Sequence, residues 1–186
     1  MTLFPELSVG WLNGWILLAI YGLVFGATVR SLPKDVIARL YDKSNWTPSQ
    51  RALTTVGKLL SSALFVILAF SPLQTGRPIF IIGSALFLLG LLGLVIALLN
   101  FSQVQPGCPA TTGLYRISRN PQWIMLIIVF MGGSLAVGSW AALLLFTMAA
   151  TCYHFRILAE ERSCLAQYGD AYRDYLTRVP RYLLFF

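Results

Sequence analysis

The chain has few charged side chains and little of the chemistry that stabilises small soluble or disulfide-rich folds. Only 11% of its 186 residues are Asp, Glu, Lys or Arg, whereas about 25% is usual in a soluble domain. Its three cysteines, Cys108, Cys152 and Cys164, have no Cys-x-x-Cys spacing and no histidine cluster beside them. This argues against a disulfide framework or a metal site. The composition, 57% hydrophobic, indicates a membrane protein.

The first residues also lack the basic segment that opens a secretory signal peptide. No Lys or Arg precedes the first apolar run, so we interpret that run as a retained helix. Most of the apolar segments approach the ~20 residues needed to cross a ~30 Å bilayer core, and they cover about 11–29, 55–73, 78–101, 121–137 and 140–158. We predict an all-α polytopic membrane protein with about five transmembrane helices. It forms a single domain over 1–186, with a cytoplasmic helical tail at 159–186.

The fourth apolar segment is short and glycine-rich at its end. Gly132, Gly133 and Gly138 lie there, which predicts a tight hairpin with the fifth segment and a turn near Gly138-Ser139-Trp140. A second interpretation stays open, in which four segments span the membrane and this hairpin is re-entrant. In segment one, Gly22 and Gly26 are expected to pack closely against a neighbouring helix, as are the small residues of segment three.

The basic residues are sorted by the predicted crossings. Of the 14 Lys and Arg residues, only Arg77 falls in a link on the other side. The remaining basic residues occupy the link between segments one and two, the link before segment four and the tail: Arg30, Lys34, Arg39, Lys43, Arg51, Lys58, Arg116, Arg119, Arg156, Arg162, Arg173, Arg178 and Arg181. The positive-inside rule makes that face cytoplasmic and puts the N-terminus outside. This sorting also explains the net charge of +7 without nucleic-acid binding, because the basic residues are spread over several links.

Two polar links are predicted to be partly helical. The first is amphipathic, with Val36, Ile37 and Leu40 on one face, and should lie along the membrane interface. In the tail, Gly169 is expected to end one helix, and a second short helix should run from Asp170 to Val179. The apolar residues 182–186 should then dock back on the protein or the membrane.

Two polar clusters flank the stretch from Gln122 to Phe155, which carries no Asp, Glu, Lys or Arg. Gly113–Pro121 precedes it and Arg156–Glu161 follows it. An apolar hairpin returns its two ends to one membrane surface, so the clusters should meet, and charges at such a boundary often form a functional site. Arg156 and Glu160 are four residues apart and should face each other.

The same clusters also have a purely structural interpretation. Asn-Pro is a good helix start, with Asn120 as the cap and Pro121 at the first position. Arg116 and Arg119 would then be membrane anchors, and His154 a packed interior residue.

Taken together, the motifs Gly-Leu-Tyr-Arg-x-x-Arg-Asn-Pro-x-Trp and Arg-x-x-x-Glu-Glu-x-x-x-x-x-x-Tyr-Gly-x-x-Tyr resemble the isoprenylcysteine carboxyl methyltransferase family. That family belongs to a wider group of integral membrane methyltransferases that includes phospholipid N-methyltransferases. The resemblance covers about 113–180. It implies S-adenosylmethionine as cofactor and a lipophilic small molecule or lipid as methyl acceptor, with membrane lipids as surroundings and no metal or nucleic acid.

The resemblance also implies roles for individual residues. The cofactor would be enclosed by Tyr115, Arg119, Asn120, Pro121, Trp123, Glu160 and Glu161. Arg156 would hold the acceptor near the reacting centre, and His154 or Glu161 could remove a proton from a thiol or an amine.

Two departures from the family pattern leave the acceptor open. Asn120 stands where the family usually has His, so this position can donate and accept hydrogen bonds but cannot carry charge. The loop at 102–112, which forms the substrate side in the family, is short. Two alternatives therefore remain, an NADPH-dependent sterol-reductase-like membrane enzyme and a non-catalytic membrane scaffold.

Overall fold

The computed structural model describes residues 1–42 and 46–183 and confirms an all-helical fold, with no named strand in those ranges. A short 3-10 turn, η1 (Gly113–Arg116), precedes α5. The described ranges contain seven α-helices, namely α1 (Trp15–Ser31), α2 (Lys34–Leu40), α3 (Pro48–Phe70), α4 (Pro78–Ser102), α5 (Pro121–Ala136), α6 (Trp140–Tyr168) and α7 (Asp170–Arg178). Lys43 and the last three residues of the predicted tail lie outside the described residues.

Each of the five predicted apolar segments corresponds to one helix. α3, α4 and α6 are long and apolar enough to cross a membrane, and α1 and α5 are shorter apolar helices of 17 and 16 residues. The predicted start of the first segment at residue 11 is wrong, because the chain there is tied to the end of α3. Gly14 N–H donates to the Ser71 carbonyl at 2.9 Å, and the helix begins only at Trp15.

The start of α3 and the end of α6 differ from the boundaries of the predicted apolar segments, because helix-forming sequence extends beyond the apolar residues. α3 starts at Pro48, where Thr47 and Gln50 form a reciprocal capping box, a strong N-terminal signal. α6 continues without a break to Tyr168, so the predicted boundary at 158 is a change of polarity within one helix. Gly169, with φ of 56°, ends α6 as predicted, since this backbone conformation favours glycine.

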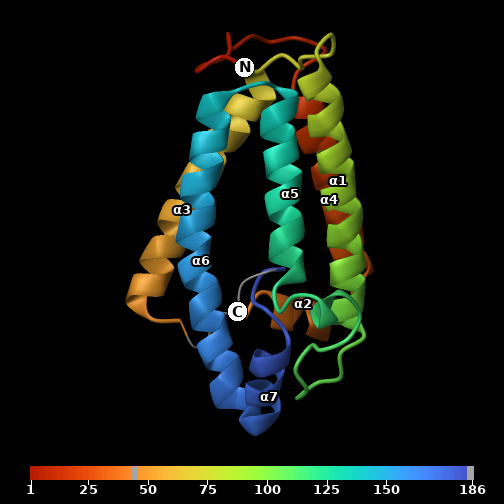
Figure 1. Ribbon diagram of the computed structural model, residues 1–186, viewed down its shortest axis with the longest axis vertical. Helices are drawn as coiled ribbons and strands as arrows, with labels where there is room; N and C mark the ends of the chain where they lie inside the picture. The colour runs from red at the N-terminus through yellow and green to blue at the C-terminus, as the bar shows by residue number, and fades with distance from the viewer. Residues whose placement is uncertain (43–45, 184–186) are drawn as a thin grey trace.

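The helices run up and down between two ends of one bundle (Figure 1). α3 and α6 pack together on one side, and α4 packs closely on α5 on the other. The predicted turn between α5 and α6 is confirmed at Gly138, where φ is 65°. Thr2 N–H donates to the Gly138 carbonyl at 2.9 Å, and Gln74 N–H donates to the Ala136 carbonyl at 3.0 Å. The hairpin therefore reaches the upper end of the bundle, where the N-terminus and the α3–α4 link lie, as five crossings require.

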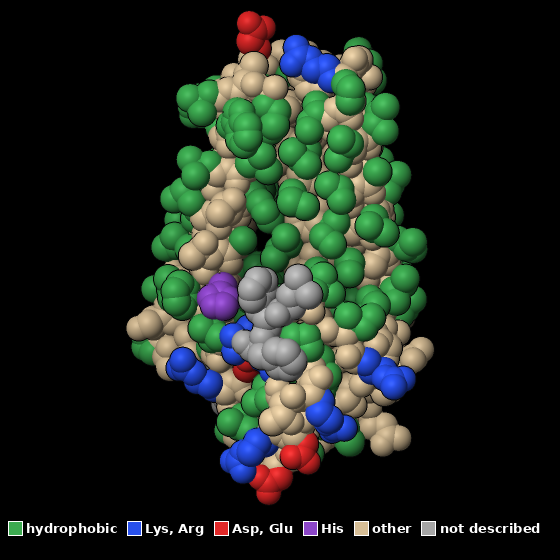
Figure 2. All heavy atoms as spheres, viewed as in Figure 1, with side chains coloured by type: hydrophobic (Ala, Val, Ile, Leu, Met, Phe, Trp, Pro, Cys, Tyr) green, Lys and Arg blue, Asp and Glu red, His purple; other side chains and the backbone are tan. Residues whose placement is uncertain are grey.

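Charge is separated along the bundle in the way that the sequence predicts. Figure 2 shows Lys and Arg side chains gathered at the lower end, with an apolar girdle above them. Arg77 is in the link between α3 and α4, at the upper end. Exposed apolar side chains such as Leu88, Leu92 and Leu144 form the girdle, as expected of a surface that faces lipid.

Small residues allow the close approach of α4 and α5. A Cβ at Gly83 would lie 2.5 Å from the Ala136 backbone nitrogen, and one at Gly90 would lie 2.7 Å from the Val129 backbone nitrogen. The expectation for segment three is thus confirmed. The expectation for Gly22 and Gly26 is wrong within this chain, because an added Cβ at either position would meet nothing within 4 Å.

Candidate functional site

The two polar clusters meet at the lower end of the bundle, as the hairpin predicts. Arg119, just before α5, places its Nε 3.1 Å from Oε1 of Glu161 on α6. The neighbouring Asn120 donates from Nδ2 to the same oxygen at 3.2 Å. The prediction that the Asn120 side chain caps α5 is wrong, because the cap makes no side-chain hydrogen bond. The amide is used instead to join the two helices.

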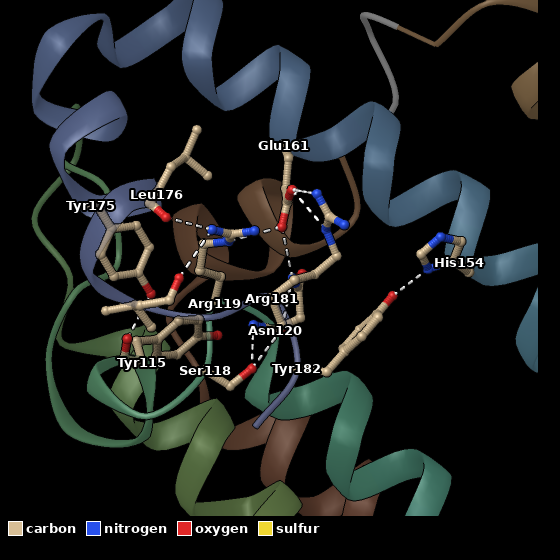
Figure 3. Close-up of polar contacts among 11 residues, drawn as sticks. Tyr115, Ser118, Arg119, Asn120, His154, Glu161, Tyr175, Leu176, Arg181 and Tyr182 are labelled. Carbon is tan, nitrogen blue, oxygen red and sulfur yellow. Dashed lines mark hydrogen bonds and ion pairs between the residues drawn. The ribbon is translucent and has the colours of Figure 1, made fainter. Parts of the chain in front are cut away.

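Glu161 is the centre of this network (Figure 3). Its carboxylate accepts hydrogen bonds from the side chains of Arg119, Asn120 and Arg181, and Arg181 Nε lies 2.9 Å from Oε2. The residue is only 8% exposed, so this pairing takes place away from water. The hydrogen bond to Glu161 raises the pKa of Arg181 above its ordinary value. Both oxygens of the carboxylate are thus committed to partners within the protein.

The C-terminal strap, which we define as residues 179–182, is held against the start of α5. Arg119 N–H donates to the Pro180 carbonyl at 3.0 Å, and Ser118 Oγ donates to the Arg181 carbonyl at 2.8 Å. Arg119 Nη1 also donates to the carbonyls of Leu176 and Val179. Arg119 therefore clamps α5, α6 and the end of α7 together, with a side chain only 3% exposed.

A cavity of about 460 Å³ lies beside this network. Its wall includes residues of both sequence clusters, of the α1–α3 link and of the link that follows α4. The predicted site residues that line it are Tyr115, Arg119, Asn120, Trp123, Arg156, Glu160 and Glu161. Pro121 and His154 are not among its lining residues. The volume is within the range of small-molecule pockets, about 300–1,000 Å³.

Aromatic rings and one accessible ion pair form much of the cavity wall. Trp123 on α5 contacts Tyr153 on α6 edge to face, with ring centroids 4.9 Å apart. Arg156 Nε and Glu160 Oε1 are 2.7 Å apart, which confirms the predicted pairing of these two residues. Their side chains are 31% and 38% exposed. This carboxylate is thus more accessible to a ligand than that of Glu161.

His154 has a different environment from the other predicted catalytic residues. Its Nδ1 lies 2.8 Å from the hydroxyl of Tyr182 in the C-terminal strap. The pair shown in Figure 3 thus links α6 to the strap. The predicted role of His154 as a base stays a prediction, and its contact with Tyr182 fits the interior histidine of the alternative interpretation equally well.

Several lining residues were not singled out from the sequence. Arg39 of α2 and Phe101 of α4 both line the cavity, and Arg39 lies over the Phe101 ring at 5.5 Å. The amphipathic pattern of the first link predicted an interfacial helix, but Val36 is only 2% exposed, so α2 packs on the bundle. The apolar face of this segment was the sequence feature that could have predicted its packing on the bundle.

The tail contributes tyrosines to the same cavity. Tyr172 and Tyr175 of α7 line it, and the Tyr175 hydroxyl donates to the Tyr115 carbonyl at 2.6 Å. Burial raises the pKa of Tyr115, Tyr172 and Tyr175 above the ordinary tyrosine value. All three rings therefore remain neutral at physiological pH and present aromatic faces and hydroxyl groups.

A bundle of apolar helices, three of which are long and apolar enough to cross a membrane, defines an integral membrane protein, and a polar, aromatic-walled cavity lies at one end of it. Within the described ranges, no group of three His, Cys, Asp or Glu residues could hold a metal ion. Residues 100–171, from the end of α4 into α7, match a family model described as phospholipid methyltransferase. This match covers less than half of the chain and agrees with the resemblance of 113–180 to integral membrane methyltransferases. Searches of curated proteins and of solved structures found no match.

Proposed function

We propose that the protein transfers a methyl group from S-adenosylmethionine to a lipophilic or amphipathic acceptor at the face of the membrane where the basic residues gather. The observation that carries this proposal is a cavity lined by both sequence clusters, and these clusters lie in a segment that matches a methyltransferase family. The matched segment includes the whole of α5 and of α6, and the start of α5 and the second half of α6 supply most of the polar wall. We propose further that residues 1–186 form one domain around this cavity.

The residues present fit the donor. S-adenosylmethionine, when bound, supplies a reactive methyl group on a positively charged sulfur. Trp123 and Tyr153 offer aromatic surface for a flat base or a cation, and Glu160 offers a carboxylate for hydroxyl groups. Arg156 can hold an anionic group. Each of these side chains lines the cavity.

The network around Glu161 suits a positioning role. Three side chains donate to its carboxylate, and they come from the start of α5 and from the strap. This pairing fixes Asn120 and the first turn of α5, which carries Trp123, against α6. We propose that Glu161 orders the cavity wall, whereas Glu160 and Arg156 contact ligands directly.

The acceptor's chemistry determines whether a base is needed. A carboxylate is ionised at pH 7 and can attack without losing a proton, whereas a thiol or an amine must lose one. The predicted bases are Glu161, which is surrounded by donors, and His154, which pairs with Tyr182. An anionic acceptor of the carboxylate type needs the least from these residues and is the acceptor that this arrangement suits best.

We also propose that the N-terminus lies outside and the C-terminus in the cytoplasm. The sorting of basic residues to one end supports this orientation through the positive-inside rule. It would place the cavity where S-adenosylmethionine is available. Reporter fusions after Met1 and after residue 186 test the orientation, and a cytoplasmic N-terminus would contradict it.

Calorimetric titration of the detergent-purified protein tests the function. S-adenosylmethionine, S-adenosylhomocysteine and NADPH should be titrated separately into the wild type and into the variants Trp123→Ala and Glu160→Gln. Asp174→Asn, an exposed change on α7, is the matched control. We expect the first two ligands to bind, with at least tenfold weaker binding in the cavity variants and no change in the control. Binding of NADPH alone would favour the reductase alternative, and no binding by folded protein would favour the scaffold.

A further inference from the structure

A second, smaller cavity lies at the lower end of α3 and has no part in the proposed methyl transfer. Its volume is about 250 Å³, and it is lined by Trp46, Arg51, Thr54, Thr55 and Lys58. Positions 51, 54, 55 and 58 follow the spacing that places side chains on one helix face. One face of α3 and the ring of Trp46 therefore line a polar pocket that is open to the surface, since Arg51, Thr55 and Lys58 are exposed.

The lining of this cavity carries two positive charges and no negative charge. Among the described residues, neither Arg51 nor Lys58 takes part in an ion pair. Lys58 lies in the second half of the third turn of α3, inside the helix that is apolar enough to span the membrane. Charges at such depth are costly unless they are paired or reach the interface. Helical side chains lean toward the helix N-terminus, so Lys58 leans toward Arg51 and toward the lower end.

Thr54 provides an independent indication of a missing polar partner. It is 4% exposed, and its hydroxyl has no hydrogen-bond partner within residues 1–42 and 46–183. Thr55, the next residue, behaves as helical threonines usually do, and its hydroxyl donates to the Arg51 carbonyl at 2.9 Å. A buried hydroxyl without a partner is destabilising. A ligand oxygen in this cavity would provide one after a rotation of the Thr54 side chain.

We propose that this cavity binds a phosphate group, carried either by an anionic phospholipid of the adjacent leaflet or by a soluble phosphate. Two cations and a hydroxyl on one helix face match the acceptor oxygens of a phosphate. The position at the basic end of the bundle is where lipid phosphates lie. Lys58, reaching down from the apolar part of α3, would neutralise the headgroup while the acyl chains contact the exposed side chains around it.

The site is separate from the main cavity but adjacent to it. Trp46 lines both cavities, and Arg156 lies over its ring at 4.9 Å. Phosphate binding would therefore fix the indole that covers a proposed acceptor-binding residue. The phosphate site does not depend on the methyl-transfer proposal, since its ligand, residues and binding assay are all different.

Native mass spectrometry of the detergent-purified protein tests the site. The probes are dioleoylphosphatidylglycerol, zwitterionic dioleoylphosphatidylcholine and sodium phosphate. The test variant is Arg51→Gln/Lys58→Gln, and the matched control is Arg30→Gln/Lys34→Gln, which removes the same charge from exposed positions at the same end. We expect the wild type to prefer the anionic lipid and the test variant to bind it at least tenfold more weakly, with the control unchanged.

The two possible sources of the phosphate give different results. Displacement of the lipid by millimolar sodium phosphate would assign the site to soluble phosphates, whereas no displacement would assign it to a lipid headgroup. Equal weakening in both double variants would show attraction by overall charge alone and would overturn the proposal. Unchanged binding in the Arg51→Gln/Lys58→Gln variant would overturn it as well.

Thr54→Val separates ligand binding from structural effects. The exchange removes the unpartnered hydroxyl at nearly constant shape, so the thermal midpoint without lipid should stay the same or rise. Affinity for the anionic lipid should nevertheless fall severalfold. An unchanged affinity would overturn the role of Thr54 in the site. Binding of S-adenosylhomocysteine should be kept in all of these variants, so a failure of this proposal is distinguishable from a failure of the proposed function.

Discussion

The substitution Glu161→Gln should destabilise the protein strongly, because it leaves buried guanidinium charge without a counterion. The side chains of Arg119 and Glu161 are 3% and 9% exposed, so water cannot replace the lost carboxylate. Breaking a buried ion pair by removing one partner typically costs about 3–5 kcal/mol. In the variant, the glutamine amide NH₂ would replace one carboxylate oxygen and would then face another N–H donor, such as that of Arg181, which now donates to Oε2 of Glu161.

The quantity to be measured is the free energy of unfolding in mild detergent, obtained by denaturant titration. The control is Glu160→Gln, which removes an adjacent carboxylate that is 38% exposed and paired with Arg156 on the same helix. Such exposed pairs contribute about 0–1 kcal/mol. We therefore expect Glu161→Gln to cost at least about 2 kcal/mol more than the control. Equal effects of the two substitutions would refute the reasoning that Glu161 holds the network together.

Three further predictions follow from the packing, the strap and the cavity. Gly90→Ala should destabilise the bundle by about 1–3 kcal/mol, because the added Cβ would lie 2.7 Å from a backbone nitrogen of α5. The control Gly22→Ala should be neutral or slightly stabilising. Equal thermal midpoints of the two variants would contradict this prediction. Burial raises the pKa of Tyr182 from 10.0 to about 12. The unfolding free energy should therefore be level up to about pH 10 and fall as the pH rises toward 12, because over that range the unfolded chain loses the tyrosine proton first. Tyrosinate absorbance and denaturant titration check this, and a rise in stability between pH 10 and pH 12 would count against it. Glu160→Gln should weaken S-adenosylhomocysteine binding at least tenfold in calorimetry while keeping the unfolding free energy within about 1 kcal/mol of wild type, and unchanged binding would remove Glu160 from the proposed site.

The arrangement of the hairpin and its two clusters could be predicted because it follows from local patterns. An uncharged run of suitable length, interrupted at Gly138, folds back on itself in only one compact way. The polar residues at its ends must then share one surface. Arg119 and Glu161 are 42 residues apart in the sequence, and the hairpin alone was enough to predict that they meet.

The partners of Glu161 in the strap could not be predicted in the same way. Arg181 reaches Glu161 across the turn at Gly169 and the whole of α7, and no periodic pattern relates the two positions. The roles within the cluster were also beyond the sequence pattern. Adjacent acidic residues look equivalent in a motif, yet Glu161 points into the buried network and Glu160 toward the cavity, because successive helical residues project about 100° apart.

The residue at which hydropathy falls was a poor guide to where α6 ends. Hydropathy falls after residue 158 because charged side chains begin, but Glu, Arg, Ala and Leu are all good helix formers. α6 therefore continues to Tyr168 and carries Cys164 and Gln167 along the cavity wall. The lining role of Arg39 was missed for a related reason, since an amphipathic segment can lie against a membrane or against the protein itself.

The most direct test of the central claim is to locate the bound donor on the chain. Ultraviolet crosslinking of radiolabelled S-adenosylmethionine to the detergent-purified protein, followed by peptide mapping, identifies the residues that contact it. We predict crosslinks in peptides that contain Tyr115 or Trp123 and in the second half of α6, with competition by unlabelled S-adenosylhomocysteine. Crosslinks confined to other segments, or labelling that the competitor does not reduce, would contradict the assignment of this cavity as the methyl-donor site.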